Sequence, residues 1–452
     1  MMEKRFCLKT AFLLVLIIGI AGINPVGAQG VPADTLRITL QDALEIAFSD
    51  NLTIKVADLE VQRQQYVEKG AYAALFPQVD LSGSYQRTIE KQTMYMDGVP
   101  GMESGIKVGR ENYWTGGATV SLPLISVPLW KSLKISAHDV ELSIEKARSS
   151  RIDMRDQVQR AFYAVLLAED ARDVFKEAYD NALKNYEDIK NRFDQGTVAE
   201  YDLIRADVNL KNAEPNLYDA ENSIILTRWQ LKALLGIDLA WNITCIGSLT
   251  DYESTLIAEY LQTDFSLGNN SDLRQIDIQV KQLEQVRRMQ IAKYYPSLNT
   301  QFGYQWIAMN NNFKIGHYRW DPYSTVGLSL TIPVFAGGAR KNEIRQTQVQ
   351  QQQLNLQRLD AERQLRVAIR QSADQMNTCV KQYQAASAGI KQAETGYMIT
   401  MKRYETGQGT ILEINDSQLQ LTQARLNLNQ AIYNYLVSKS ALEKTLGGTT
   451  DY

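Results

Sequence analysis

Histidine is scarce in this chain of 452 residues, which holds only His138 and His317 together with three cysteines. Histidine is the side chain that metal sites and acid–base catalysis recruit most often. Neither histidine has a Cys, Asp or Glu cluster near it at ligand spacing, and the sequence shows no phosphate-binding loop or nucleophile elbow. We therefore expect no catalytic residue, no metal site and no cofactor, which argues against an enzyme.

An excess of positive charge is missing as well. The chain carries 48 Lys and Arg against 51 Asp and Glu, a formal net charge of −3. Without the first 28 residues the balance is 45 against 50, or −5. Proteins that bind nucleic acid usually present a basic face, so we expect no nucleic-acid partner. The apolar content of 44% argues against a disordered chain.

Long apolar runs are absent except near the N-terminus. The basic residues Lys4, Arg5 and Lys9 precede a short apolar run. A stretch with small residues follows this run and ends at Ala28. This pattern predicts a signal peptide over residues 1–28, cut after Ala28. The alternative is a membrane anchor, but the run is shorter than the ~20 residues of a spanning helix. Cys7 precedes the run, so we expect no lipid attachment at the cleavage point. An exported chain of this kind is either soluble or enters a membrane as a β-barrel.

The sequence repeats itself at an offset of 211 residues. Arg192 to Gly236 aligns without a gap to Arg403 to Gly447, with ten identities in 45 positions. Both copies carry large residues every seven positions, as in helices that pack like coiled coils: Leu203, Leu210, Leu217, Ile224 and Leu231, then Ile414, Leu421, Leu428, Tyr435 and Leu442. A small residue follows most of them after three positions. The pattern predicts one closely packed helix in each repeat.

Each of these helices follows another segment that is unusually long. Residues 129–194 contain no Pro or Gly and would span roughly 100 Å as a helix. The run 340–406 is similar and is interrupted only by Gly389 and Gly396. The sequence therefore predicts two antiparallel helical hairpins, at about 126–236 and about 338–447.

A strand-like segment opens at Pro77 and another at Pro296, and their partner strands end at Pro123 and Pro333. Apolar residues alternate with Ser, Thr, Gln and Gly in all four segments, which predicts β-hairpins at about 77–123 and about 296–334. Aromatic residues gather near the strand ends. Such alternation with an aromatic rim is typical of a transmembrane barrel, although a hairpin packed on a soluble core remains an alternative. Four strands cannot close a barrel, so several chains would have to share one.

The expected fold is mainly α-helical with transmembrane β-strands and an internal tandem repeat. Each repeat consists of a helix, a β-hairpin and a helical hairpin. The predicted order is a signal peptide, a first repeat, a connecting segment, a second repeat and a tail, at 1–28, 29–236, 237–271, 272–447 and 448–452.

This order resembles the TolC family of outer-membrane efflux proteins over nearly the whole mature chain. The matching segments are 40–47, Asn51-Leu52, 73–77, 330–338 and 403–407. The resemblance implies a homotrimer with a 12-stranded β-barrel, three times four strands, in the outer membrane. It also implies a helical tube through the periplasm, with a belt around its middle formed by residues 237–271 together with the C-terminal end of the chain. The implied partners are a periplasmic adaptor, an inner-membrane pump of RND or ABC type, and outer-membrane lipid. The implied function is a passive exit duct of a tripartite efflux pump or a type I secretion system.

The resemblance places the adaptor-docking tip of the tube at two turns. These turns contain Arg192, Gly196 and Thr197 in the first repeat and Arg403, Gly407, Gly409 and Thr410 in the second. Glycine allows a tight turn and a close approach of another backbone. An alternative is that these glycines only stop the helices, and the two roles are compatible.

The resemblance also places an acidic ring at the periplasmic aperture, formed by Glu413 and Asp416. Six carboxylates in a trimer would favour cations, whereas the alternative is that both residues only stabilise a helix N-terminus. The family prototype has a basic latch residue where this chain has Gly409, and the matching first-repeat positions hold Tyr201 and Asp202. These two residues are candidate gate contacts, but the prototype's gate bonding does not transfer.

A periplasmic coiled-coil scaffold or adhesin without a conduit is the main alternative function. It would not require four strands with an apolar face. A periplasmic hydrolase is disfavoured by the shortage of histidine. The sequence leaves open the cargo and whether Cys245 and Cys379 are free.

Overall fold

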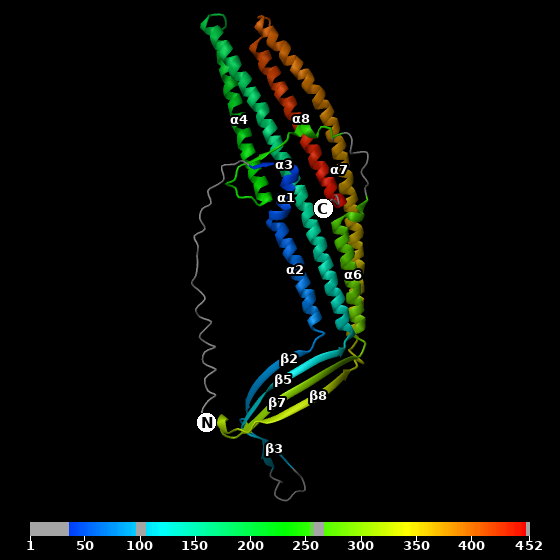
Figure 1. Cartoon of the computed structure of the whole chain (residues 1–452). Coiled ribbons are helices and arrows are strands. Elements are labelled where there is room, and N and C mark those ends of the chain that lie inside the picture. The colour runs from blue at the N-terminus through cyan, green and yellow to red at the C-terminus, as the bar shows by residue number, and fades with distance from the viewer. Residues whose placement is uncertain (1–35, 96–104, 255, 257–265, 449–452) are drawn as a thin grey trace.

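The computed structural model describes residues 36–95, 105–254, 256 and 266–448. The predicted signal peptide, part of the segment 237–271 and residues 449–452 of the predicted tail lie outside the described residues. The described chain is long and narrow, with a β-sheet at one end and two helical turns at the other (Figure 1).

Long helices make up most of the molecule. The α-helices described are α1 (Leu40–Asp50), α2 (Leu52–Ala73), α3 (Val127–Asp194), α4 (Glu200–Leu235), α6 (Ser271–Ala292), α7 (Ala339–Glu405) and α8 (Ile411–Leu446). Three short 3-10 helices are η1 (Leu249–Tyr252), η3 (Leu267–Asn269) and η4 (Ile315–His317). In the described part of the chain, no helix combines the length and apolar character needed to cross a membrane.

The four longer strands form one antiparallel sheet in the order β2-β5-β7-β8. Their bounds are β2 (Gln78–Arg87), β5 (Asn112–Ile125), β7 (Ser297–Asn310) and β8 (Asp321–Thr331). The strands β3 (Gln92–Met94) and β4 (Ile106–Val108) extend the β2–β5 hairpin beyond the sheet, and β1 (Leu36–Ile38) pairs in parallel with β6 (Ile243–Cys245).

The register of the sheet collects the apolar residues on one face. Val79 pairs with Val120, which pairs with Phe302, which pairs with Val326. The neighbouring row consists of Asp80, Thr119, Gly303 and Thr325 and points to the other face. The sheet therefore has one apolar and one polar surface, and β2 and β8 are its edges.

Two strand ends differ from the sequence expectation. β5 continues past Pro123 to Ile125, with a register shift between these residues, because a bulge tolerates a residue without an N–H. β8 ends at Thr331, two residues before Pro333. The small β3–β4 hairpin lies between β2 and β5 in the chain, where the sequence predicted no strands.

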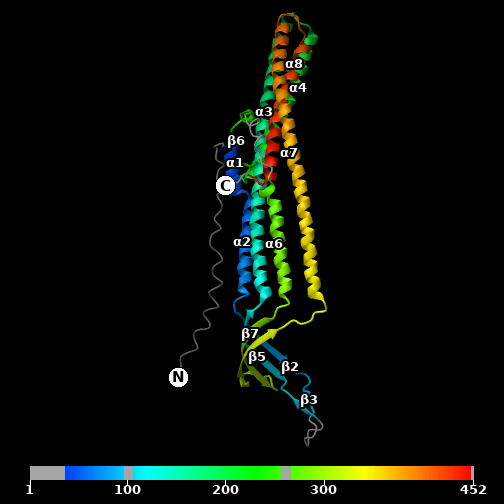
Figure 2. The ribbon, with the colours of Figure 1, turned by 90° about the vertical axis from the view of Figure 1, so that its right-hand side faces the viewer.

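The two repeats share one kind of joint in the middle of the molecule. The Asn51 side chain caps α2 and donates to the Leu234 carbonyl oxygen at the end of α4, at 2.7 Å. The Asn270 side chain caps α6 and donates to the Thr445 carbonyl oxygen at the end of α8, also at 2.7 Å. Each short helix therefore begins where a hairpin helix ends, and α2, α3, α6 and α7 all reach the sheet at one level (Figure 2).

The largest apolar core lies around this joint. Phe162 and Leu166 of α3, Leu231 of α4 and Tyr435 of α8 are fully buried there. Cys245 and Cys379 are buried and free, and burial raises the pKa of the Cys245 thiol to about 12. The core fixes both hairpins at their bases.

Candidate functional site

The two tip turns have the same backbone geometry. In the first, the Gly196 N–H donates to the Phe193 carbonyl oxygen at 2.8 Å, and the Thr197 N–H donates to the Arg192 carbonyl oxygen at 2.9 Å. In the second, Gly407 and Gln408 donate to Tyr404 and Arg403 in the same way, at 3.0 and 2.8 Å. This is the Schellman ending of a helix, which requires a left-handed residue, and Gly196 and Gly407 have φ values of 73° and 74°. The sequence repeat at an offset of 211 residues is therefore matched by the same backbone conformation in both turns.

The turns differ in how the next helix begins. The Thr410 hydroxyl accepts from the Glu413 N–H, and the Glu413 carboxylate accepts from the Thr410 N–H, which forms a capping box on α8. The corresponding residue before α4 is Ala199, which makes no side-chain cap. The start of α8 is thus fixed by side chains, whereas the side-chain hydrogen bond of the first turn is that of the Thr197 hydroxyl, which donates to the Arg192 carbonyl oxygen at 2.8 Å.

Gly409 lies against the backbone of its own turn. A Cβ at this position would stand 3.0 Å from the Tyr404 nitrogen, and the Gly409 N–H donates to the Arg403 carbonyl oxygen at 3.0 Å. A side chain at this position would therefore require the turn to shift by a few tenths of an ångström. This crowding gives a local reason for glycine at the position where the family prototype carries a basic residue.

The two expected aperture carboxylates have different surroundings. Nη1 of Arg403 lies 3.8 Å from Oε2 of Glu413, whereas the Asp416 carboxylate is exposed and, within the described residues, accepts from Gln420 alone, at 2.9 Å. In the first repeat Asp202 corresponds to Glu413, and Arg205 corresponds to Asp416. Of the two carboxylates, Asp416 is therefore the one without an ion-pair partner among the described residues.

A small apolar cluster joins the two hairpins just behind their tips. Ile189 of α3, Ala206 of α4 and Ile411 and Ile414 of α8 are buried together. Tyr404 packs against this cluster, with the Arg192 guanidinium 5.5 Å from its ring centroid. Burial raises the pKa of the Tyr404 hydroxyl, and the nearby charges of Asp202 and Asp188 add to the rise, while Arg192 opposes it. Tyr201 is exposed and stacks under Arg205 of its own helix, at 5.4 Å.

Sequence reasoning missed one residue that links the hairpins further from the tip. The Arg425 guanidinium on α8 pairs with Glu177 of α3 and with Glu394 of α7, the latter at 3.1 Å. Asn209 of α4 also donates to Asn415 of α8, at 3.2 Å. The sequence signal was a change in the sign of the charge between the repeats, with Arg425 in the second and Glu214 at the corresponding position of the first. A single sequence does not show which residues pair with Arg425.

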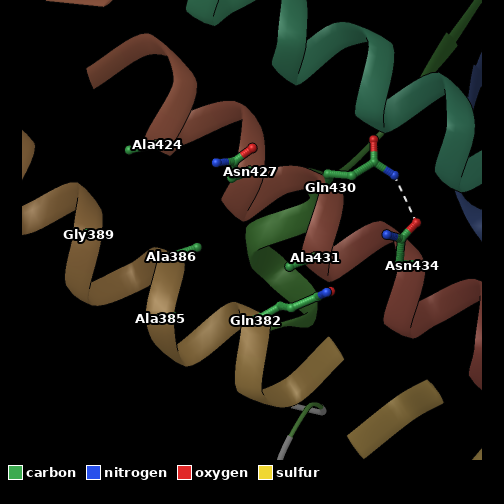
Figure 3. Close-up of a pocket in the computed structure, with 9 residues that line it drawn as sticks. All are labelled: Gln382, Ala385, Ala386, Gly389, Ala424, Asn427, Gln430, Ala431 and Asn434. Atoms are coloured by element: carbon green, nitrogen blue, oxygen red, sulfur yellow. Dashed lines mark hydrogen bonds between the residues drawn. The ribbon is translucent and has the colours of Figure 1, made fainter. Parts of the chain in front are cut away.

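A cleft of about 540 Å³ runs between α7 and α8 (Figure 3). Its lining combines small residues with amides: Ala385, Ala386, Gly389, Ala424 and Ala431, with Gln382, Asn427, Gln430 and Asn434. The Gln430 amide donates to the Asn434 side chain at 2.8 Å. The small residues keep the cleft open, and the amides offer donors and acceptors along its wall. Among the residues that the structure describes, no group of three or more His, Cys, Asp or Glu is placed to hold a metal ion.

Comparison with known proteins gives matches over both repeats. The family model described as outer membrane efflux protein matches residues 43–237 and 264–448. The outer membrane protein TolC of Vibrio cholerae is 19% identical over 379 residues, 83% of each chain. The alkaline protease secretion protein AprF of Pseudomonas aeruginosa is 21% identical over 419 residues, 90% of this chain and 84% of the relative.

Among solved structures, the CmeC outer membrane channel of Campylobacter jejuni superposes with a TM-score of 0.70 at 19% identity. The alignment covers 90% of this chain and 85% of that one. At this identity the likeness concerns the fold. It confirms the fold class predicted from the sequence, a mainly helical chain with a short antiparallel sheet at one end.

Proposed function

Because this chain belongs to the outer membrane efflux protein family and is an outer-membrane efflux channel rather than an enzyme, we propose that three copies form one passive duct. In this proposal an inner-membrane pump of RND or ABC type supplies the energy, and a periplasmic adaptor joins the pump to the duct. The duct conducts substrates from the periplasm to the exterior.

The open edges of the sheet carry the proposal. β2 and β8 are edge strands of 10 and 11 residues, and each presents unpaired backbone groups. Four strands are too few to close on themselves, since transmembrane barrels have at least about eight. Pairing β2 of one copy with β8 of the next would close three sheets of four strands into one barrel of twelve. The apolar face would then point to lipid and the polar face to the lumen.

Exposed apolar stripes on the helices support the same assembly. On α4 the stripe consists of Ile204, Val208, Tyr218, Ile225 and Trp229, and α2 continues it with Leu52, Val56, Leu59 and Tyr66. α7 carries a second stripe of Val349, Leu356, Leu359 and Val367. Apolar surface of this extent is usually covered in the functional assembly. We propose that the α2–α4 stripe of one copy covers the α7 stripe of its neighbour.

Aromatic residues support the proposed position of the barrel in the membrane. Toward the far end of the sheet, the rings of Tyr85 and Trp114 lie 4.3 Å apart, whereas Tyr304 lies near the middle of β7 with its ring 4.8 Å from that of Trp306. At the helix end, exposed aromatics precede or follow the strands: Tyr72, Phe76, Trp130, Tyr294, Tyr295 and Phe335. Two such belts are the usual boundary of a membrane-spanning barrel.

We propose the two tip turns as the adaptor-docking surface, with the α7–α8 cleft as its continuation along the tube. Both turns expose a glycine whose missing side chain leaves the backbone accessible. The cleft offers small residues for close helix approach and amides for hydrogen bonds. At the aperture, the Asp416 carboxylates would supply most of the preference for cations, and Tyr201 and Asp202 remain candidate gate contacts.

Assembly and conduction test the proposal together. We expect the purified protein to run as a heat-modifiable trimer from outer-membrane fractions and to form discrete conductance steps in planar bilayers. The variant Val326→Lys/Leu328→Lys places charge on the apolar face of the edge strand β8, which would point to lipid. This variant should fail to insert into the membrane. A monomer that remains in the aqueous phase without detergent would contradict the duct and favour the scaffold alternative.

A further inference from the structure

Positive charge is concentrated where the helices meet the sheet. The four segments at this junction, 66–76, 126–138, 289–297 and 332–345, contain seven basic residues and two acidic ones. The basic residues are Lys69, Lys131, Lys134, Lys293, Arg340, Lys341 and Arg345, and the acidic ones are Glu68 and Glu343. We call these seven residues the basic collar. A surplus of five positive charges per copy is unusual in a chain with a net charge of −3.

The other two ends of the molecule lack this surplus. In the sequence, the segments that connect β2 with β5 and β7 with β8, residues 87–112 and 308–323, contain six basic and five acidic residues. The tips, residues 186–205 and 397–416, carry five basic and eight acidic residues. The collar is therefore a local feature and does not follow from the composition of the chain.

The collar residues come from all four helices that reach the sheet. Lys69 lies one turn before the end of α2, Lys134 lies in the second turn of α3, Lys293 follows the last residue of α6, and Lys341 lies in the first turn of α7. All seven residues thus lie within ~10 Å of a helix end next to the sheet. Figure 2 shows these four helix ends at the same height.

Few of these charges are neutralised within the chain. Lys293 pairs with Glu343 at 2.9 Å, which accounts for one of the two acidic residues. In the described part of the chain, Lys69, Lys134, Lys341 and Arg345 form no ion pair, and all four are exposed. Arg340 lies over a ring of the aromatic belt, 5.0 Å from the ring centroid of Tyr294, whereas Lys69 is 5.3 Å from that of Tyr66 in the α2 stripe. The collar therefore adjoins the aromatic belt at the helix end of the sheet.

We infer that the basic collar binds the headgroups of anionic phospholipids in the membrane leaflet nearest the helices. An aromatic belt followed by a ring of Lys and Arg matches the order of acyl chains, interface and charged headgroups. Lysine and arginine provide several donors to a phosphate oxygen, and their long side chains can reach toward the interface. This inference rests on the proposed placement of the sheet in the membrane, and it adds the class of lipid that surrounds it.

Quenching of Trp130 by brominated lipid measures the inference, because Trp130 lies beside Lys131 in the chain. The other five tryptophans are replaced by Phe, and this full-length protein, whose collar is unchanged, is inserted in vesicles of phosphatidylcholine and phosphatidylglycerol, with either lipid brominated. We expect phosphatidylglycerol to associate about fivefold more strongly than phosphatidylcholine, and the preference to fall as ionic strength rises. The variant Lys69→Gln/Lys134→Gln/Lys341→Gln/Arg345→Gln should show a preference of about one.

The chain offers a matched control. The variant Lys176→Gln/Lys184→Gln/Lys381→Gln/Lys391→Gln removes four exposed lysines from α3 and α7 at least ~60 Å from the sheet. It should keep the fivefold preference. A second collar variant that only exchanges Lys and Arg, Lys69→Arg/Lys134→Arg/Lys341→Arg/Arg345→Lys, should also keep it, which separates charge from folding.

The other possible outcomes contradict either the collar inference alone or the proposed function as well. If the neutralised variant inserts and conducts normally but keeps its preference for phosphatidylglycerol, the collar inference is wrong and the duct stands. If neutralisation changes the ion selectivity of the channel and leaves the lipid preference unaltered, the basic side chains face the lumen and the inference is again wrong. If the unsubstituted protein does not insert at all, the proposed function fails and the collar inference fails with it.

Discussion

The two helical hairpins have nearly the same backbone but different side-chain chemistry. Both end in Schellman turns at Gly196 and Gly407, and both meet a short helix at a capping asparagine. The α3–α4 hairpin begins its second helix without a side-chain cap, whereas the α7–α8 hairpin has the capping box, the Arg403–Glu413 pair and the Arg425 bridge. The repeat thus preserves the backbone geometry, whereas the helix cap and the ion pairs differ between the hairpins, the first having the pair of Arg228 with Glu169 at 2.6 Å.

The joints allow the most severe test of this comparison. At Gly447, φ is 101° and a Cβ would lie 2.1 Å from the Asn269 carbonyl oxygen, whereas at Gly236 φ is 73° and the nearest contact is 3.0 Å. Gly447→Ala should destabilise the chain by roughly 2–5 kcal/mol, from the left-handed backbone and the overlap together. Gly236→Ala should cost about 1–2 kcal/mol. Thermal unfolding of the assembled protein measures both, and equal losses would show that the joints are equivalent.

Ion selectivity distinguishes the two carboxylates near the tip of the second hairpin. In the part of the chain that the structure describes, Asp416 forms no ion pair, whereas Glu413 lies 3.8 Å from Arg403. Asp416→Asn should therefore lower the cation preference severalfold, and Glu413→Gln should lower it less. Reversal potentials in asymmetric salt give the ratio, with Asp202→Asn as the first-repeat control. If Glu413→Gln has the larger effect, the surroundings described for these residues do not govern the aperture.

The Arg425 bridge tests whether the second hairpin holds the first. Arg425→Gln removes ion pairs to Glu177 and Glu394, in which the Arg425 side chain is 27% exposed. We expect a loss of about 1 kcal/mol, after allowing for solvent, and more frequent opening of the tip in single-channel records. Its first-repeat counterpart, Glu214→Gln, should leave both unchanged. If the two variants give identical single-channel records, Arg425 does not connect the two hairpins.

The smallest expected effect concerns Asp170, which fixes the connecting segment to α3 by accepting the Leu249 N–H at 3.2 Å. Burial raises the pKa of this carboxyl above its ordinary 3.8. The resulting stability is present below about pH 4 and is lost as pH rises through the raised pKa. From pH 4 to pH 7, the Tm of Asp170→Asn should therefore rise more, or fall less, than that of the unsubstituted protein. The exposed control Asp180→Asn should behave like the unsubstituted protein, and a parallel pH profile for Asp170→Asn would exclude this role.

The regular parts of the fold could be read from the sequence because they depend on local periodicity. Seven-residue spacing from Leu203 to Leu231 and from Ile414 to Leu442 marks the buried faces of α4 and α8. Two-residue alternation marks the sheet, and its rows of paired residues keep the apolar side chains on one face. The ends of elements were less accessible: Pro123 was expected to end a strand, but the bulge allows β5 to continue.

The candidate site could be predicted only in part. Gly196 and Gly407 are found at tip turns because a left-handed helix ending favours glycine. The pairing of Arg403 with Glu413, and the crowding that explains Gly409, depend on distances within a turn. The Arg425 bridge joins residues 248 positions apart in the chain, and no pattern in one sequence indicates such a pair.

The sequence by itself determined the repeated helices, the two-faced strands and the surplus of positive charge beside them, because periodicity and composition are properties of neighbouring residues. Tertiary structure alone decided which charges are paired, which edges of the sheet stay open and that all four cationic helix ends lie at one level. The physical reason is that pairing and exposure depend on groups brought together through space by the packing of α3 against the helices around it.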